Sequence, residues 1–410
     1  MSPVSRLPRV RAAGPALLAL LTADVAARLL TPPAPRIAPV EVDAEAYFSA
    51  EEIDRGRRYA RPQLALALAR GAVELGALAG LVALAARRRR GGPAGRLRTP
   101  LVDGASTGAA MAVGLTLAPL PLSALARRRA IKVGLVTQSW RGWAGDLVKS
   151  TAIETVLAAA AGGAVVALTR RYPRNWWLPA AVGSSGVGTL FGALAPVVLA
   201  PLFNEFEPLP EGELRSDVLE LAATARVEVG EVYSVDASRR TTGVNAYVTG
   251  LGPTKRVVLF DTLLDRYSRD EIRTVVAHEL AHVRHRDVWR GVVYGALVAP
   301  GTAFAIQRLS WALSEERGTA AALPALALAA ALVAGPVGPI VNRVSRAMER
   351  RADEFALELS GAPDAFVSFE RTIAVQNVAD IRPPRWVSSV LATHPPTLER
   401  IGAALAYSRR

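Results

Sequence analysis

Long apolar runs separated by short charged segments dominate the first two hundred residues of the chain. A helix that crosses the hydrocarbon core of a bilayer, ~30 Å thick, needs roughly 20 mostly apolar residues, because its backbone groups must be hydrogen-bonded within the segment. Seven runs are candidates for such helices: residues 16–30, 64–86, 104–126, 151–168, 178–203, 291–306 and 319–341. The pattern therefore predicts a mainly α-helical, polytopic membrane protein with about seven transmembrane helices.

The first two candidates carry charged residues and leave alternatives open. Residues 16–30 follow a basic segment, as the apolar core of a signal peptide does, but no small-x-small cleavage pattern follows and prolines end the run. We expect a retained helix. In the second run, Arg70 and Glu74 are four residues apart and share one helix face, where they can neutralise each other. An ionisable pair inside a membrane can also mark a functional site.

Charged residues become dense from residue 204 to residue 290, and short helix-like and strand-like patterns alternate there. The pattern predicts an amphipathic helix, a strand, and a strand pair around a turn, at residues 213–225, 227–235, Ala246–Thr249, Arg256–Phe260 and 250–253, respectively. We expect two domains. Residues 1–203 form a membrane domain of about five transmembrane helices, and residues 204–410 form a small α+β domain interrupted by a transmembrane hairpin at about residues 291–341.

Composition restricts the chemistry. The chain has no cysteine and only four histidines, so a metal site must use imidazole and carboxylate ligands. Three histidines, His278, His282 and His285, fall within eight residues. The net charge of +13 comes mainly from arginine blocks beside the apolar runs, which fits lipid headgroups better than nucleic acid. We expect no nucleic-acid partner.

The segment around the first two histidines has the pattern of a catalytic metal site. A capping-box pattern at residues 268–271 starts a helix that runs through HELAH, residues 278–282. His278 and His282 lie on one face of this helix, where both imidazoles can reach one Zn²⁺. Glu279 is suited to take a proton from an attacking water and to deliver it to a leaving amine. The alternative is an amphipathic helix whose histidines bind no metal.

A catalytic zinc needs a third protein ligand and an open fourth position. No further histidine follows at a short interval, so the candidate is Glu349, on a helix expected directly after the last apolar run. Asp353, one turn further on the same face, can hold a histidine N–H. From spacing alone, a solvated helix face explains both carboxylates equally well. His285 lies two turns from His278, too far for the same ion, and we expect it to form a hydrogen bond near the helix end.

Distinctive short segments occur along nearly the whole chain: residues 47–49, 51–53, 201–214, 245–250, 258–264, 345–353, 393–396 and 399–400. Together with the HELAH helix, they resemble the type I CaaX prenyl protease family of membrane gluzincins, with the bacterial heat-shock membrane proteases as more distant relatives. The resemblance implies that His278, His282 and Glu349 bind one Zn²⁺ per chain and that Glu279 is the general base and acid. It also implies seven helices around a water-filled intramembrane chamber.

The resemblance assigns further roles that spacing alone does not. It implies that a substrate peptide lies extended along one strand by edge-strand hydrogen bonds, and this strand comprises Asn245, Ala246, Tyr247, Val248 and Thr249. His394 resembles the histidine that supports the substrate carbonyl or oxyanion. Without the resemblance, a histidine before two prolines is as readily a helix-entry residue. Arg400 is assigned to the same substrate region.

The sequence therefore predicts an integral, multi-pass membrane zinc endopeptidase that hydrolyses peptide bonds by metal-activated water. Its expected partners are the lipid bilayer and a peptide or membrane-associated protein substrate, and a monomer is compatible with the sequence. We expect a bacterial cell membrane, with the active site reached from the cytoplasmic side. Two alternatives remain: a membrane-protein quality-control protease of the heat-shock type, and a non-catalytic receptor or transporter with a structural metal.

Overall fold

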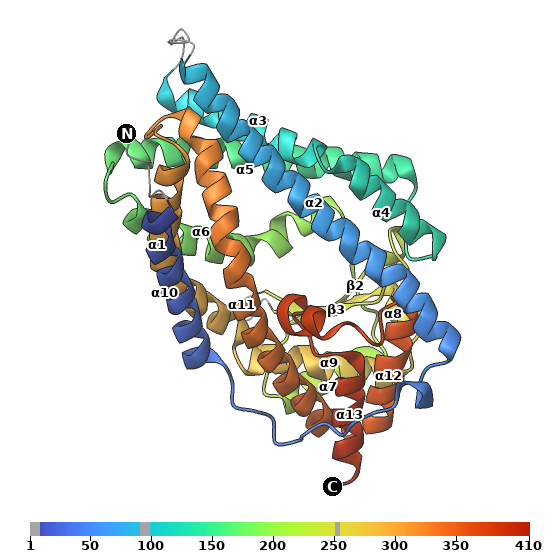
Figure 1. Cartoon of the computed structure of the whole chain (residues 1–410). Helices are drawn as coiled ribbons and strands as arrows, with labels where there is room; N and C mark the ends of the chain where they lie inside the picture. Colours follow the sequence, from blue (N-terminus) through green and yellow to red (C-terminus); the bar gives the residue numbers. More distant parts are fainter. Residues whose placement is uncertain (1–8, 91–98, 251–254) are drawn as a thin grey trace.

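The computed structural model describes residues 9–90, 99–250 and 255–410, and most of these residues are helical (Figure 1). The helices that carry the apolar runs are α1 (Arg9–Leu30), α2 (Ala50–Arg90), α3 (Pro100–Leu117), α4 (Leu120–Lys132), α5 (Trp140–Arg171), α6 (Trp177–Val198), α10 (Asp287–Leu313) and α11 (Leu323–Ser360). Each predicted apolar run coincides with one or two of these helices. The predicted mainly helical membrane fold is thus confirmed.

Five of the described helices are long and apolar enough to cross a membrane: α2, α5, α6, α10 and α11. Helices α3 and α4 pass the same test only as a pair, which is bent by 42°. The run predicted over residues 104–126 is therefore present as two helices with a bend, and not as a single helix. The helix breaks at Ala118 and Pro119, because Pro119 donates no backbone hydrogen bond and its ring clashes with the preceding turn; Pro121 follows in the first turn of α4. Helix α1 does not pass this test, although it packs along α10 and α11.

Two tryptophans on α10 mark the expected thickness of the membrane. Trp289 and Trp311 are separated by about 33 Å of helix, close to the thickness of a hydrocarbon core, and tryptophan is enriched at membrane interfaces.

Helix α11, which neighbours α10, joins the membrane part to the polar part without a break. Helix α11 has 38 residues, so it is about 57 Å long and extends well beyond the lipid. The separate helix expected after the last apolar run is instead the continuation of α11, which carries Glu349 and Asp353.

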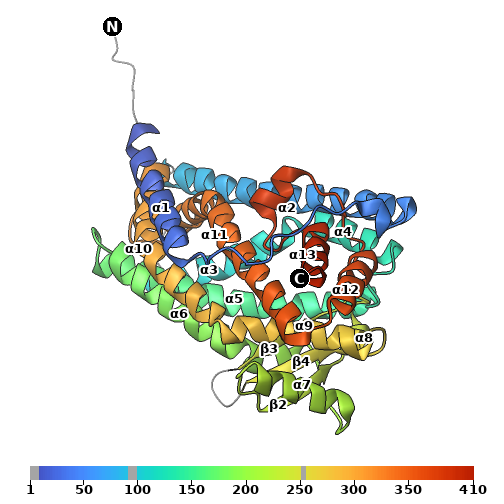
Figure 2. The same ribbon diagram turned by 90° about the horizontal axis from the view of Figure 1, so that it is seen from below.

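The polar domain lies between diverging membrane helices. In Figure 1, α2 and α11 are close together near the top and separate downwards, with α9 (Arg269–Arg284), α12 (Pro363–Gln376) and α13 (Thr397–Ser408) between their lower halves. Figure 2 shows the sheet on the side of the molecule opposite α2. The membrane helices α2 and α11 therefore flank the helices of the polar domain, and the sheet lies on the side of those polar-domain helices that faces away from α2.

Four strands form one mixed sheet: β1 (Phe206–Pro208), β2 (Glu231–Val235), β3 (Ala246–Thr249) and β4 (Arg256–Phe260). Their order is β1-β2-β4-β3, with β2 and β4 parallel and the other pairs antiparallel. Strand β1 is not predicted from the sequence, because three residues ending in proline show no alternation of apolar and polar positions. Residues 251–253 of the predicted turn lie outside the described residues. Strand β3 is at the edge, so one of its sides is free of any other described strand.

Helices α7 (Glu213–Thr224) and α9 pack on this sheet through a cluster of buried aliphatic side chains. Its members include Val218, Leu221, Val257, Leu259, Ile272, Val276 and Leu280. The capping box predicted at the start of α9 is present, since Ser268 and Glu271 each accept a hydrogen bond from the other's backbone N–H. The cap and the cluster together fix the helix that carries the two central histidines.

An extended segment, residues 31–43, connects α1 to the start of the α2 region and crosses α13 on the way. The Val40 N–H donates to the Gly402 carbonyl over 3.2 Å. A Cβ on Gly402 would lie 2.2 Å from the Val40 oxygen, so this close approach requires glycine. The N–H groups of Arg36 and Ile37 donate to Glu354 on α11. The segment thus holds α13 against α11.

Candidate metal centre

Helix α9 directs two imidazoles to one point. His278 and His282 are one turn apart, and their Nε2 atoms lie 3.3 Å from each other. Their side chains are mostly enclosed, with exposed fractions of 11% and 23%. This is the arrangement expected for an i, i+4 pair on one helix face.

Helix α11 brings a carboxylate to the same point. Glu349 Oε2 lies 3.2 Å from His278 Nε2, and Glu349 Oε1 lies 3.7 Å from His282 Nε2. One possible ligand atom from each of the three residues lies within 4.8 Å of the others. The three side chains that the sequence predicts as ligands are therefore brought together by two different helices.

The donor set fits a divalent metal ion. Glu349 Oε2 is buried and makes no hydrogen bond within the described part of the chain, although buried carboxylate oxygens are normally satisfied. Burial lowers the pKa of His278, but the carboxylates of Asp353 and Glu349 outweigh it and raise this pKa to about 10, so the local field attracts positive charge. Two histidines and one glutamate, with a fourth position open, are the ligands of a known class of catalytic zinc site.

The second ring nitrogen of each histidine, Nδ1, contacts an aspartate. Asp353 Oδ1 lies 2.9 Å from His278 Nδ1, and Asp287 Oδ2 lies 3.0 Å from His282 Nδ1. A carboxylate at Nδ1 keeps the proton on that nitrogen and leaves Nε2 as a free donor atom. The sequence predicts Asp353 in such a contact but does not predict Asp287.

Asp287 reaches His282 because of a sharp turn between α9 and α10. Arg286 has φ +58°, in the left-handed region that non-glycine residues rarely adopt. The turn starts α10 immediately after α9 and returns Asp287 to the last turn of the preceding helix. The five-residue separation of Asp287 from His282 gives no periodic signal, and the signal that remains in the sequence is an acidic residue directly after the helix that carries the two histidines.

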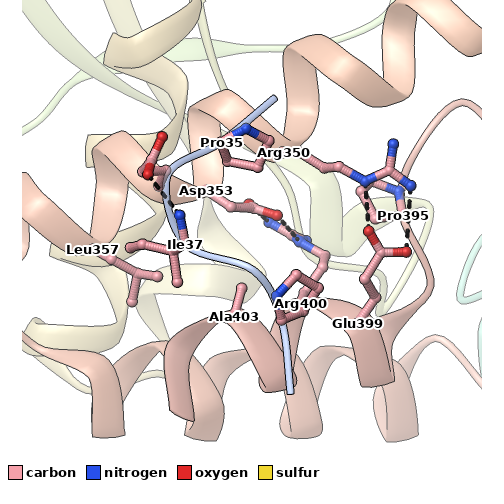
Figure 3. Close-up of a pocket in the computed structure, with 11 residues that line it drawn as sticks. Pro35, Ile37, Arg350, Asp353, Leu357, Pro395, Glu399, Arg400 and Ala403 are labelled. Carbon is pink, nitrogen blue, oxygen red and sulfur yellow. Dashed lines mark hydrogen bonds and ion pairs between the residues drawn. The ribbon is translucent and has the colours of Figure 1, made fainter. Parts of the chain in front are cut away.

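Two arginines support the aspartates. Arg400 donates from Nε and Nη2 to both oxygens of Asp353, over 3.0 and 2.6 Å, as Figure 3 shows. Arg351 donates from Nη2 to Asp287. Both Arg400 and Asp353 line a pocket of about 20 Å³ that the 31–43 segment covers (Figure 3). Arg400, expected near the substrate, thus contacts the support of His278.

Glu279 follows His278 on α9 and is half-buried. Its carboxylate has no hydrogen bond or ion pair with any residue that the structure describes. Burial raises the pKa of Glu279, against the opposing effect of His278 and His282. A desolvated carboxylate without a partner is a stronger base than a solvated one and is free to exchange protons.

His394 lies at the open side of the three ligands. Its Nε2 is 3.4 Å from Glu349 Oε2, and its side chain is 63% exposed. The Nδ1 atom is 2.9 Å from Thr393 Oγ1. His285, by contrast, lies at the C-terminal end of α9 against the ring of Phe355 and is not part of the ligand group.

The edge strand β3 runs beside α9. Among the strands that the structure describes, residues Ala246–Thr249 pair with β4 alone, in register Tyr247↔Val258. The Asn245 carbonyl accepts from the Phe260 N–H, and the Asn245 side chain accepts from the Ala246 N–H. Both contacts hold the start of the strand and leave its outer edge open to an added chain.

The charge pair expected in α2 is not formed. Glu74 is exposed and Arg70 is half-buried, and among the described side chains the two share no ion pair. The i, i+4 spacing brings such residues within reach without requiring contact, because both side chains are long and flexible.

Comparison with known proteins gives matches over most of the chain. Residues 38–205 match the family model "CAAX prenyl protease N-terminal, five membrane helices", and residues 208–408 match the model of peptidase family M48. The uncharacterized metalloprotease YhfN of Bacillus subtilis (strain 168) is 33% identical over 295 residues, which are 70% of this chain and 69% of YhfN. A CAAX prenyl protease 1 homolog of Oryza sativa subsp. japonica is 34% identical over 218 residues, but the alignment covers only 51% of each protein.

A solved structure shares the fold. The crystal structure of S. mikatae Ste24p matches with a TM-score of 0.73 and 22% sequence identity, over 98% of this chain and 100% of that one. The family models, the bacterial relative and the membrane-spanning helices together show that the chain belongs to peptidase family M48 and that it is an integral-membrane metallopeptidase.

Proposed function

We propose that this metallopeptidase is a zinc endopeptidase in which His278, His282 and Glu349 hold one Zn²⁺ per chain. The observation that carries the proposal is the convergence of three ligand atoms within 4.8 Å, next to the unpartnered carboxylate of Glu279. When bound, zinc supplies Lewis-acid chemistry: it lowers the pKa of water and polarises the scissile carbonyl.

Glu279 carries the proton transfers. Its carboxylate takes a proton from the attacking water as the water oxygen forms a bond to the carbonyl carbon. It then gives this proton to the amine nitrogen as the carbon–nitrogen bond breaks. The water is thus divided between the two products, and no covalent bond between enzyme and substrate forms. Burial raises the pKa of Glu279, which makes its carboxylate a better base for the first transfer and leaves a proton to give in the second.

The substrate lies extended along the free edge of β3, with Asn245, Ala246, Tyr247, Val248 and Thr249 as its partner strand. Backbone pairing of this kind aligns any peptide, so specificity comes from the side-chain surroundings. His394, exposed beside Glu349, donates a hydrogen bond to the carbonyl oxygen as negative charge develops there. Arg400 does not contact the substrate directly, because its guanidinium donates two hydrogen bonds to Asp353; it acts on the site through that aspartate.

The substrates are peptides or membrane-associated proteins, cut in the manner of a CaaX prenyl protease. Support comes from the matched family model of the membrane part and from α11, which runs from the apolar segment directly into the site. We place the protein in a bacterial cell membrane, with the site reached from the cytoplasmic side and a domain division between residues 203 and 204.

The test compares the purified protein with its Glu279→Gln variant on a farnesylated CaaX peptide and on the unmodified peptide, each with and without chelator. We expect Glu279→Gln to lower the cleavage rate by about 10²- to 10⁴-fold, since it removes general acid–base catalysis. Zinc content, measured by mass spectrometry, should stay at one per chain in the variant. Preference for the farnesylated peptide supports a CaaX-like cutter.

Other outcomes separate the alternatives. Equal digestion of misfolded soluble proteins indicates a quality-control protease. Full function of Glu279→Gln, or no cleavage by the zinc-loaded protein, indicates a receptor or transporter with a structural metal and contradicts the proposal.

A further inference from the structure

A second buried carboxylate lies behind His278 and takes no part in the reaction described above. Glu370, on α12, has a side chain that is only 3% exposed, and its Oε1 lies 2.6 Å from Arg400 Nη1. Burying a carboxylate is costly unless it is paired. Arg400 supplies the partner that the buried carboxylate needs, so the question is what this ion pair does for Arg400.

Arg400 divides its donors between two carboxylates. Nε and Nη2 face the two oxygens of Asp353, and Nη1, on the remaining corner of the guanidinium, faces Glu370. The guanidinium is planar, so contacts on two of its sides fix its orientation, whereas one contact leaves it free to rotate. With Asp353 Oδ1 at 2.9 Å from His278 Nδ1, the contacts form a continuous chain from Glu370 to the histidine.

Helix α12 holds Arg400 with two residues rather than one. Phe366 and Glu370 are four residues apart and share a helix face. The guanidinium carbon of Arg400 lies 5.5 Å from the centre of the Phe366 ring, within cation–π range. The carboxylate thus sets the direction of the guanidinium, and the ring flanks it.

We propose that Glu370 is a positioning residue for the metal site. Through its ion pair with Nη1, it orients Arg400 so that Nε and Nη2 face Asp353, and Asp353 in turn directs His278 Nε2 to the metal. The proposal rests on the proposed function, because it takes His278 as a metal ligand.

The role depends on an oxygen at the right distance rather than on a full negative charge. Burial raises the pKa of Glu370 to about 7, against the effect of Arg400. Both protonation states present an oxygen to Nη1. Glutamine offers the same oxygen at the same reach, whereas aspartate keeps the charge but is one methylene too short.

The experiment measures zinc affinity by chelator competition for the full-length protein and its Glu370→Gln and Glu370→Asp variants. We expect Glu370→Gln to bind zinc within about threefold of the parent. Glu370→Asp should weaken binding about tenfold, the lower end of the range for groups that orient metal ligands. The Tm gain on adding zinc should shrink for Glu370→Asp only.

Glu231→Asp is the matched control. Glu231 also pairs with one arginine, Arg215, through both of its oxygens, and it lies on β2 outside the chain of contacts to His278. The same shortening there should leave zinc affinity unchanged while lowering Tm.

Two results overturn the proposal. If Glu370→Asp binds zinc as tightly as the parent, Glu370 is only structural. If Glu370→Gln loses as much affinity as Glu370→Asp, an oxygen at the right reach is not sufficient and the negative charge is required as well. A parent protein that binds no zinc, or a His278→Ala variant that binds it equally, instead contradicts the proposed function and leaves a different signature from either result.

Discussion

The two histidines of the candidate metal centre are supported by the same kind of group in opposite charge surroundings. Behind His278, Arg400 lies between two carboxylates, Asp353 and Glu370. Behind His282, one carboxylate, Asp287, lies between two arginines: Arg351, and Arg290 with Nε at 3.6 Å. The first arrangement carries one more carboxylate than arginine, and the second carries one more arginine than carboxylate.

This difference shows how one site can hold one ligand more firmly than the other. A carboxylate whose charge is shared by two cations attracts the histidine N–H less than one that shares a single cation. The His282 side chain is also about twice as exposed as that of His278, at 23% against 11%. We infer that His278 is the firmly held ligand and that His282, at the turn where α10 begins, is the more adjustable one.

The largest expected effect comes from neutralising each aspartate in turn. Asp353→Asn removes the charge behind His278 and leaves Arg400 with one carboxylate, so we expect zinc affinity to fall by about 10- to 100-fold. Asp287→Asn removes a charge that two arginines already offset, and a loss of about threefold is expected. Chelator competition at one fixed pH measures both. Equal losses, or a larger loss for Asp287→Asn, would contradict the unequal roles of the two histidines.

The sequence predicted the parts of this site that depend on helical spacing. The i, i+4 pair of histidines and the i, i+4 pair Glu349 and Asp353 follow from a regular period. The contact of Asp287 depends on a left-handed residue at Arg286, and the orientation of Arg400 depends on how α13 packs against α11. Neither tertiary feature leaves a periodic signal, so the sequence could not predict which groups surround the Nδ1 atom of His282.

The fold shows the same division. Apolar runs identified which segments enter the membrane, because hydrophobicity decides that transfer. They did not show where the polar continuations of the same helices end. Helices α2 and α11 extend beyond the apolar runs to 41 and 38 residues. Hydropathy also did not reveal the break between α3 and α4, since prolines there count as part of an uncharged run.

A second test replaces each supporting arginine by lysine. Arg400 contacts three carboxylate oxygens from three different nitrogens, and a single ammonium group cannot reproduce this geometry. Arg351 reaches Asp287 through Nη2, while its Nε is buried without a hydrogen bond in the described structure. We expect Arg400→Lys to weaken zinc binding about tenfold and Arg351→Lys about twofold.

The control for this test is the Tm of each variant in excess chelator, which reports stability without the metal. A similar Tm for the two variants with unequal zinc affinity supports the comparison. Equal zinc affinity would mean that the two arginines contribute only charge.

The smallest expected effect has the opposite sign. Arg290 Nε lies 3.6 Å from Asp287, and Arg290 Nη1 donates to the Leu30 carbonyl at the end of α1. In Arg290→Gln, Asp287 loses one of its two cations, attracts the His282 N–H more strongly and makes His282 a better donor, so zinc affinity should rise by about twofold. The Tm should fall, because the contact with α1 is weakened. Arg290→Lys keeps the charge and should leave affinity unchanged. A drop in zinc affinity for Arg290→Gln would mean that Arg290 holds Asp287 in place, and that geometry rather than charge distinguishes the two sides.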